Sequence, residues 1–444
     1  MEFVIREDNI DAKVFISKDQ LDKETMKQIR AIIHHECVDH VRFMPDCHRG
    51  MGCCVGFTSR LTGKITPSYV GGDIGCGILM YPIGDVIYKK KLEKIEKIIN
   101  DLIPTGSSHT SVWEKGQEKA TARHIETICE FSTEEANKFT KKYEEKFNVD
   151  ISSFIPEYSI EWLKSKCQQI NSDYDYDIRS LGTLGGGNHY IEINESKDQI
   201  GYVTIHCGSK NFGHKVYEFH HDIITESNQF DWNMYDEEIK QVKRKIKDPK
   251  QLKQFSDELK QRLNDQRHPN YLEGDEAYRY FFDMIFAQNY AKMNRRIILS
   301  LIIDAIGVYY DNSLIIESVH NYIDFHDMII RKGAISSYSD KLSIVSLNMR
   351  DGILLCKGKD NEDWNYSSAH GAGRLINRTI ASQKLSMKKY IEQMKHVCST
   401  SVVHETLDES PMAYKDTEMI KEALEPTLTI IDHMKPIINI KGLS

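Results

Sequence analysis

The chain has 444 residues, 40% of them hydrophobic and 28% charged, so it is long enough to bury a large core and has a globular composition. Its formal net charge of −8 excludes a surface coated with positive charge for nucleic acid, so any polyanion would have to bind a local basic patch. The longest apolar run, residues 297–303, ends at Asp304 and is too short to span a bilayer.

Cysteine usage and the N-terminal residues both bear on the compartment. Ten cysteines are scattered along the chain without a Cys-x-x-Cys pair, which favours free thiols over a disulfide framework. The first residues, MEFVIREDNI, are charged from Glu2 onward and contain no apolar signal core. We therefore expect a cytoplasmic protein with no membrane partner.

Strand-rich and helical segments alternate along the chain. Residues 1–80 are expected to form short strands between glycine loops, residues 89–99 a mixed-charge helix, and residues 112–170 mainly polar helices. Strands are expected over 178–207, a charged helical arm broken near Pro249 over 236–266, and an apolar helix over 276–306. Further strands are expected around 314–320, 324–331 and 342–357, followed by a helix over about 375–395.

This pattern predicts an α+β protein. Strand-rich, glycine-rich segments occur in all three thirds of the chain, and no proline- or serine-rich linker separates them. We expect one composite domain over residues 1–444, with mixed β-sheets and a mainly helical excursion around 215–300.

Six short stretches place side chains that can bind metals or phosphate in glycine-rich turns or at the ends of strands. They are PDCHRGMG (Asp46, His48), GGDIGCG (Asp73, Cys76), GGGNH (Asn188, His189), IHCGSKNFGH (His206), SVHNYIDFH (His320, Asn321) and SSAHGAGR (His370). A single histidine beside a strand is usually structural, and three consecutive glycines alone indicate a tight turn or a close backbone approach to a ligand. Together, the six stretches indicate a site.

The acidic, thiol and imidazole groups among them suit divalent metals. Asp73 and Cys76 are three residues apart in a glycine loop, so both can face one ion. With His189, His206 and His320 they supply enough ligands for two ions if Cys76 bridges them. Paired metals suit reactions at phosphorus. Ligand softness alone favours zinc, and the spacing does not identify the metal.

His370 is surrounded by small residues and precedes the helix expected from residue 375. Backbone amides at a helix start, together with Arg374, would form an anion cradle, so His370 could bind phosphate or attack it. Asp46 could orient its imidazole. The alternative is a capped helix start with a buried histidine. The chain contains neither a Walker-type phosphate loop nor the Lys-x-Asp-Gly motif of lysine-adenylating ligases.

The motifs PDCHRGMG, GGDIGCG, LGTLGGGNHYIE, HCGSKNFG, HN, HGAGR, SPMAYKD and INIKG occur in the order found in the RtcB family, which the chain resembles from Asp46 to Gly442. RtcB proteins are GTP-dependent RNA ligases that join a 3′-phosphate or 2′,3′-cyclic-phosphate end to a 5′-hydroxyl end. The resemblance implies a single RtcB-type domain around a two-metal site, with RNA as the partner and GTP and two Mn²⁺ ions as cofactors.

The resemblance also implies roles for matching residues. Asp73, Cys76 and His189 would bind one manganese ion, and Cys76, His206 and His320 the other. His370 would take GMP from GTP, oriented by Asp46. The implied guanylate pocket, in which Tyr414 would stack on the base, comprises Asn188, Glu192, His320, Asn321, Ser346, Asn348, Met349, His370, Gly371, Ala372, Gly373, Tyr414 and Lys441.

Two departures from the family pattern concern the substrate. Lys210 stands where the family usually has arginine, which keeps the charge but loses the planar fork. The usual PGSMG loop reads SLNMRDG over 346–352, which adds Arg350 and resembles a bacterial branch associated with RNA repair. We assign RNA or phosphate contact to Lys210, Arg350 and Arg374, and consider the basic side of the 236–266 arm, whose alternative is a solvated helix. Transfer RNA, ribosomal RNA and other damaged RNA stay open as substrates, as does an accessory activating protein.

Two other functions compete with ligation. A two-metal phosphoesterase could use the same ions without guanylylation, but it would need neither His370 as a nucleophile nor Tyr414 as a stacking partner. A homologue that binds RNA or nucleotide with little catalysis is the second alternative, against which stands the presence of every expected ligand and of the nucleophile.

Overall fold

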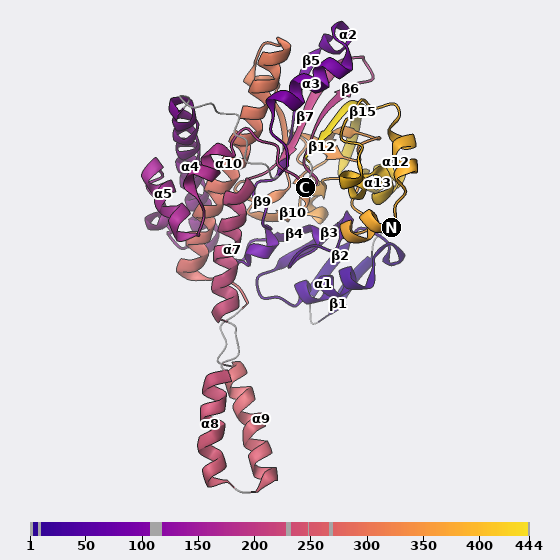
Figure 1. Cartoon of the computed structure of the whole chain (residues 1–444). Helices are drawn as coiled ribbons and strands as arrows, with labels where there is room; N and C mark the ends of the chain where they lie inside the picture. The colour runs from indigo at the N-terminus through magenta and orange to yellow at the C-terminus, as the bar shows by residue number, and fades with distance from the viewer. Residues whose placement is uncertain are drawn as a thin grey trace.

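The computed structural model describes residues 3–7, 10–106, 118–227, 232–246, 248–265 and 270–442, and two large β-sheets with long helices dominate it (Figure 1). The first sheet has the strand order β1-β2-β3-β4-β10-β9 and is mixed, because β2 and β3 run parallel. The second has the order β12-β13-β15-β6-β7-β5-β8, with every neighbouring pair antiparallel. A two-stranded sheet, β11-β14, completes the strands.

The strands are β1 (Phe3–Glu7), β2 (Ile10–Val14), β3 (Asp39–His48), β4 (Val55–Arg60), β5 (Gly77–Gly84), β6 (Tyr190–Glu195), β7 (Gly201–Cys207), β8 (Ile316–Val319), β9 (Asn321–Asp324), β10 (Ile329–Lys332), β11 (Ala334–Ser336), β12 (Leu342–Ser346), β13 (Ile353–Gly358), β14 (Ser367–Ala369) and β15 (Leu428–Lys441). The α-helices are α1 (Lys23–Ile33), α2 (Val86–Lys89), α3 (Leu92–Leu102), α4 (Glu118–Phe147), α5 (Ile160–Gln169), α6 (Tyr174–Arg179), α7 (Lys210–Ser227), α8 (Trp232–Lys245), α9 (Pro249–Asp265), α10 (Gly274–Ile306), α11 (Arg378–Lys384), α12 (Met387–Met394) and α13 (Thr417–Leu424).

Alternation along the seven-stranded sheet separates its core face from its functional face. On β6, Ile191 and Ile193 pack into a core shared with α3 and the second half of α10. The residues that alternate with them, Tyr190 and Glu192, therefore point to the opposite face. The same alternation applies to β7 and β15, so His206, Asn439 and Lys441 lie on that face as well. One face of the sheet is thus closed by helices, and the other is available for a site.

The 33-residue helix α10 connects the two halves of the molecule. Its first half contributes to the largest core, together with residues of α4 and α7, and its second half packs on the seven-stranded sheet. It ends at Gly307, whose φ of +80° is the left-handed conformation that favours glycine at a helix end. Helices α8 and α9 form a hairpin that stands apart from the sheets, beyond the end of α7 (Figure 1).

The α+β prediction is confirmed, but several element boundaries differ. Residues 1–80 contain strands as expected and also helix α1, which Asp22 caps by accepting hydrogen bonds from the amides of Glu24 and Thr25. The helical excursion spans α7 to α10 and is therefore wider than residues 215–300. The arm breaks at Pro249, which begins α9, while residue 266 lies outside the described residues.

The expected helix over 375–395 is wrong, because it is two short helices. Asn377 caps α11 and Ser386 caps α12, and a break separates the two. The helix after His370 therefore begins at Arg378 rather than at about residue 375, and its cap Asn377 lines the same cavity as His370. Likewise, residues 178 and 179 belong to α6, and half of the expected strand 324–331 is a turn between β9 and β10. Residues 112–117 of the expected polar helices lie outside the described residues.

Among the residues that the structure describes, no helix is long and apolar enough to cross a membrane.

Candidate active site

A cavity of about 580 Å³ opens on the polar face of the seven-stranded sheet and collects most of the predicted residues. The predicted residues that line it are Asp73, Cys76, Asn188, Glu192, His206, His320, Asn321, Ser346, Asn348, Met349, His370, Gly371, Ala372, Gly373, Arg374, Tyr414 and Lys441. Asp46 and His189 lie directly behind this lining, in contact with His370 and Asp73. Lys210 and Arg350 do not line the cavity.

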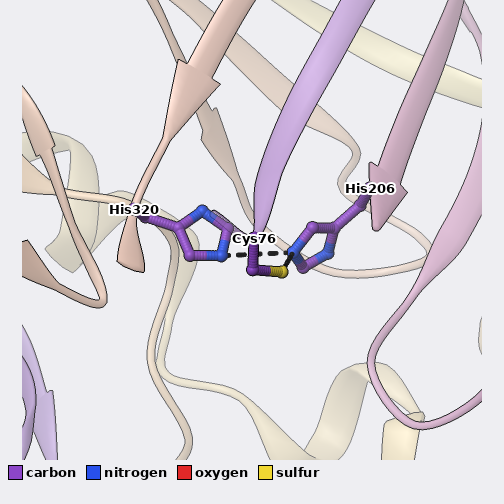
Figure 2. A group of neighbouring side chains, drawn as sticks. All are labelled: Cys76, His206 and His320. Carbon is purple, nitrogen blue, oxygen red and sulfur yellow. Dashed lines mark hydrogen bonds between the residues drawn. The ribbon is translucent and has the colours of Figure 1, made fainter. Parts of the chain in front are cut away.

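The candidate metal ligands converge on the thiol of Cys76, directly before β5. Its Sγ lies 3.3 Å from Nε2 of His206 and 3.5 Å from Nε2 of His189. His206 and His320 bring their Nε2 atoms to 3.3 Å of each other (Figure 2). Two groups of potential ligands result, Cys76–His206–His320 and Asp73–Cys76–His189, and Cys76 belongs to both.

The backbone around Asp73 is arranged to present its carboxylate. Oδ1 accepts a hydrogen bond of 3.1 Å from the amide of Ser209, and Oδ2 lies 3.0 Å from Nε2 of His189. A side chain at Gly208 would overlap the Asp73 carboxylate, so only glycine fits there. Asn321 holds the turn from the other side, because its amide donates to the carbonyl of Asp73.

The glycines before His189 serve both backbone shape and close approach. Gly185 and Gly187 have φ values of +81° and +72°, which disfavour any other residue. A Cβ at Gly185 would lie 2.8 Å from Nζ of Lys210. The turn also lets Nδ1 of His189 donate to the carbonyl of Leu184 at 3.2 Å, which directs Nε2 toward Asp73 and Cys76.

The protonation states fit a divalent cation. Burial raises the pKa of the Cys76 thiol well above its usual range and lowers the pKa of both His206 and His320. The imidazoles are therefore neutral, and their Nε2 lone pairs are free to bind. Burial would raise the pKa of Asp73, but His189 outweighs it and keeps the carboxyl ionised. An ion binding here would displace the thiol proton of Cys76.

Next to the metal-binding groups, His370 has the arrangement of an oriented nucleophile. Its Nδ1 lies 2.7 Å from Oδ2 of Asp46, a fully buried carboxylate that also accepts from the backbone amide of His370. With Nδ1 donating, Nε2 keeps its lone pair. The imidazole centroid lies 4.6 Å from that of His320. The nucleophile and the metal-binding group thus share one wall of the cavity.

Lys415 ties the parts of this arrangement together. Its Nζ donates at 3.1 Å to the carbonyls of Pro45 and Cys47, on either side of Asp46. Its backbone amide donates to the carbonyl of Gly373. Gly373 has φ +70°, and a Cβ there would lie 2.5 Å from the carbonyl oxygen of Asp46. The turn after His370 therefore packs directly on the segment that carries Asp46.

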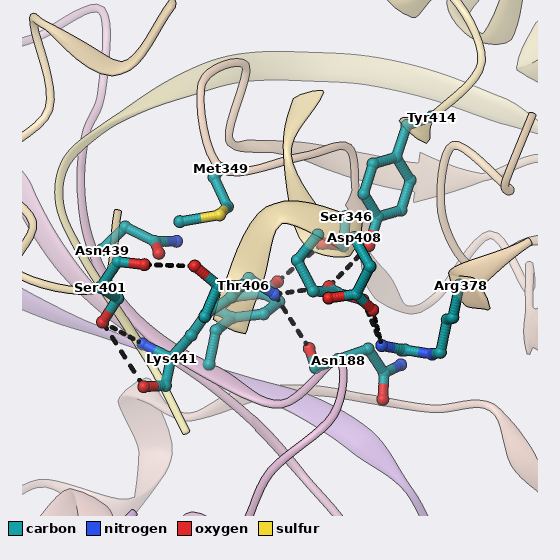
Figure 3. Close-up of polar contacts among 12 residues, drawn as sticks. Asn188, Ser346, Met349, Arg378, Ser401, Thr406, Asp408, Tyr414, Asn439 and Lys441 are labelled. Atoms are coloured by element: carbon teal, nitrogen blue, oxygen red, sulfur yellow. Dashed lines mark hydrogen bonds and ion pairs between the residues drawn. The ribbon is translucent and has the colours of Figure 1, made fainter. Parts of the chain in front are cut away.

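The opposite side of the cavity is organised around Glu409, a buried carboxylate. The Tyr414 hydroxyl donates a hydrogen bond of 2.7 Å to Glu409, and Lys441 and Arg378 each form an ion pair with Glu409 at 2.7 Å. Figure 3 shows Tyr414, Arg378 and Lys441 coming together from different segments of the chain. Arg374 adds a third cation at 3.0 Å, and its guanidinium lies 5.3 Å from the centroid of the Tyr414 ring. Burial would raise the pKa of Glu409, but the three cations hold it below its usual range.

Glu192 lies on the cavity wall with both carboxylate oxygens held. Asn194 donates to Oε2 at 2.8 Å and Asn439 donates to Oε1 at 2.7 Å, while Asn194 itself accepts from the hydroxyl of Thr204. Only 3% of Glu192 is exposed, and burial raises its pKa to about 7. The carboxylate is thus aimed and partly neutral near physiological pH.

The two departures from the family pattern have clear positions. Lys210 is at φ +58°, and its buried Nζ has no hydrogen-bond partner among the described residues. Arg350 forms a two-point contact with Asp351 at 2.7 and 2.8 Å, and Asn348 accepts from the amides of both residues. The 346–352 loop is therefore closed on itself beside the cavity.

Sequence reasoning missed several residues of the cavity, namely Tyr190, Arg378, Glu409 and Asn439. Tyr190 follows His189 directly and donates to Oγ of Ser346 at 2.8 Å, so the alternation of β6 could have identified it. Glu409 immediately precedes the SPMAYKD motif, but only the fold brings three cations to it. Arg378 begins α11, which was expected to be the interior of a longer helix.

Comparisons with known proteins agree with this geometry. The sequence model described as tRNA-splicing ligase RtcB matches residues 28–442. The chain is 26% identical to RNA-splicing ligase RtcB1 of Escherichia coli strain ATCC 25922 and 25% identical to RNA-splicing ligase RtcB of E. coli K12, in each case covering 91% of this chain and 90% of the relative. It is 23% identical to tRNA-splicing ligase RtcB of Nanoarchaeum equitans, over 98% of this chain and 96% of the relative. The chain therefore belongs to the RtcB family.

Proposed function

We propose that this protein is a GTP- and manganese-dependent RNA ligase that joins a 3′-phosphate or 2′,3′-cyclic-phosphate end to a 5′-hydroxyl end. The observation that carries the proposal is the position of His370. Its Nδ1 lies 2.7 Å from Oδ2 of Asp46, so in the neutral imidazole Nδ1 donates and Nε2 carries the lone pair, and His370 shares one cavity with candidate ligands for two metal ions and with Tyr414. A hydrolase has no use for that combination.

In the first step, Nε2 of His370 attacks the α-phosphorus of GTP. A nitrogen–phosphorus bond forms, the bond between the α-phosphorus and its bridging oxygen breaks, and pyrophosphate leaves. Asp46 accepts a hydrogen bond from Nδ1–H of His370 throughout this step, so it stabilises the positive charge that develops on the imidazole. Tyr414 would stack on the guanine, and the carboxylate of Glu192 would accept from the two donors, N1–H and N2–H, on its edge.

Asp73, Cys76 and His189 would hold one manganese ion, and Cys76, His206 and His320 the other. When bound, such ions neutralise charge on phosphoryl oxygens during displacement at phosphorus. The softness of the thiolate and imidazoles also suits zinc, so a metal titration decides between the two.

In the later steps, an oxygen of the RNA 3′-phosphate attacks the guanylyl phosphorus and releases His370. The 5′-hydroxyl oxygen then attacks the 3′-phosphate phosphorus, and GMP leaves as the new phosphodiester forms. Arg374 and Lys210 are the cations proposed to contact RNA phosphates near the metal-binding residues; Arg350 is proposed to do so from the 346–352 loop. We place this chemistry in the cytoplasm, which the free thiols of the described cysteines support.

The test is incubation with GTP labelled at the α-phosphate and Mn²⁺, followed by a denaturing gel. Wild type should carry an acid-labile label, His370→Ala should carry none, and His396→Ala, an exposed histidine outside the cavity, should match wild type. Label on His370→Ala would show that another residue is the nucleophile.

A parallel reaction separates ligation from the alternatives. RNA with a 3′-phosphate and a 5′-hydroxyl end should give a joined product that requires GTP. Loss of the 3′-phosphate without joining, and without label on the protein, would identify a phosphoesterase. Tight RNA binding with neither product would identify a binding homologue.

A further inference from the structure

The helical hairpin formed by α8 (Trp232–Lys245) and α9 (Pro249–Asp265) is a separate structural unit. Ile239 and Leu259 are buried between its two helices, with Tyr235 and Phe255 packed against them. The Tyr235 hydroxyl also lies 2.6 Å from Oγ of Ser256. The hairpin therefore has its own small core, and the turn between its helices is the part farthest from the sheets in Figure 1.

Charge is sharply divided along this hairpin. Its tip, defined as residues 240–253, contains seven Lys or Arg residues and one Asp. The remainder, residues 232–239 and 254–265, contains six Asp or Glu residues and two Lys or Arg residues. A randomly solvated helix pair has no reason to separate its charges in this way. On a chain whose net charge is −8, the tip is a local basic patch suited to a polyanion.

Three lysines of the tip are available to a partner. Lys240, Lys250 and Lys253 are exposed, and among the described residues none of the three forms an ion pair. Apolar residues of α8 at positions 235, 239 and 242 recur at helical spacing, and Tyr235 and Ile239 lie on the face that meets α9. Lys240 is therefore directed away from that face.

We propose that the tip of the α8–α9 hairpin is a second RNA-binding surface, which contacts the phosphate backbone of the RNA substrate away from the ends being joined. The inference rests on the proposed function only in taking the polyanion to be RNA. A membrane surface fits less well, because an interfacial helix needs an exposed apolar face and both helices bury theirs in the hairpin. Binding should not depend on base sequence, because the tip contains no aromatic residue for stacking.

The test uses a blocked RNA duplex with a 5′-phosphate and a 3′-deoxy end on each strand, so that the active site has no reactive end to bind. Three proteins are compared: wild type, a tip variant (Lys240→Gln, Lys250→Gln, Lys253→Gln) and a control (Lys138→Gln, Lys141→Gln, Lys142→Gln) in α4. Both variants remove three exposed lysines and change the net charge equally. The dissociation constant is measured from about 50 to 200 mM salt.

The tip variant should bind the duplex about tenfold or more weakly at the lowest salt. The slope of log binding constant against log salt concentration should be smaller in magnitude than that of wild type by about 2 to 3, because each phosphate contact contributes close to one unit of slope. The control should match wild type. Equal affinity of the tip variant and the control for the duplex would overturn the proposal. In a parallel assay with phosphatidylserine vesicles, a tip variant that loses vesicle binding but keeps duplex binding would overturn it as well.

Guanylylation measured without RNA separates this inference from the proposed function. All three proteins should be labelled equally by GTP, because the hairpin contributes no residue to the cavity. If wild type is not labelled but the tip variant still loses duplex binding, the ligase proposal fails and the RNA-binding surface stands.

Discussion

Replacing Glu192 with glutamine should stabilise the free protein at alkaline pH while weakening its selection of guanine. Burial raises the pKa of Glu192 from 4.5 to about 7, against the hydrogen bonds of Asn194 and Asn439. Folding therefore favours the protonated carboxyl, so the stability associated with this group is fully present below pH 4.5 and is lost as the pH rises through 7. The difference corresponds to about 3 kcal/mol at pH 8. Glutamine cannot ionise and avoids this cost.

The assay is urea unfolding of wild type and Glu192→Gln at pH 5 and pH 8, without nucleotide. The advantage of the variant in free energy of unfolding should grow by about 2.5 kcal/mol between the two pH values. Labelling by GTP should fall in wild type as the pH drops below 7, because the guanine donors need the ionised carboxylate. Thr204→Val is the control, because it removes the hydrogen bond from Thr204 to Asn194 and leaves the Glu192 carboxylate in place. It should change the pH dependence of unfolding and of GTP labelling much less. A variant whose advantage is the same at both pH values would refute the reasoning.

Three further changes test the rest of the site. Cys76→Ser should lower the manganese bound per chain, measured by mass spectrometry, from two ions to one or none, since both ligand groups share this thiol, whereas Cys167→Ser should match wild type. Asp46→Asn should reduce guanylylation by roughly 10²–10⁴-fold at unchanged metal content, because the imidazole loses its orienting acceptor; unchanged labelling would contradict that role. Lys415→Met should slow guanylylation at an unchanged KM for GTP, with rescue by Lys415→Arg; a rise in KM alone would argue against positioning of Asp46.

The candidate metal ligands and the candidate nucleophile were accessible from the sequence because each lies in a short motif with its own physical signature. Local spacing was sufficient to pair Asp73 with Cys76 in one glycine loop, whereas the assignment of His189 to the same ion came from the family resemblance. The structure brings these residues into two overlapping ligand groups. The possibility that Asp46 orients His370 was open from the residue types alone, but 324 residues separate the two, so only the fold could bring them to 2.7 Å.

The residues that the sequence could not reveal depend on packing between distant segments. Glu409 looks like an ordinary acidic residue in a polar stretch, and its surroundings appear only when Arg374, α11 and β15 place three cations against it. Asn439 is likewise unremarkable on its own strand; the antiparallel pairing of β15 with β6 brings its amide to Glu192.

The error over residues 375–395 has the same origin and changes the chemistry expected at His370. The segment has helical composition, but Asn377 and Ser386 each cap a new helix and divide it. The first helix therefore starts later than expected, at Arg378, and the turn directly after His370 is held by Asp46 and Lys415. A helix N-terminus would have favoured an anion beside His370 whatever the protonation of its neighbours. The observed arrangement instead makes the nucleophile depend on one buried carboxylate, which is why a single change at Asp46 is expected to separate nucleotide transfer from metal binding.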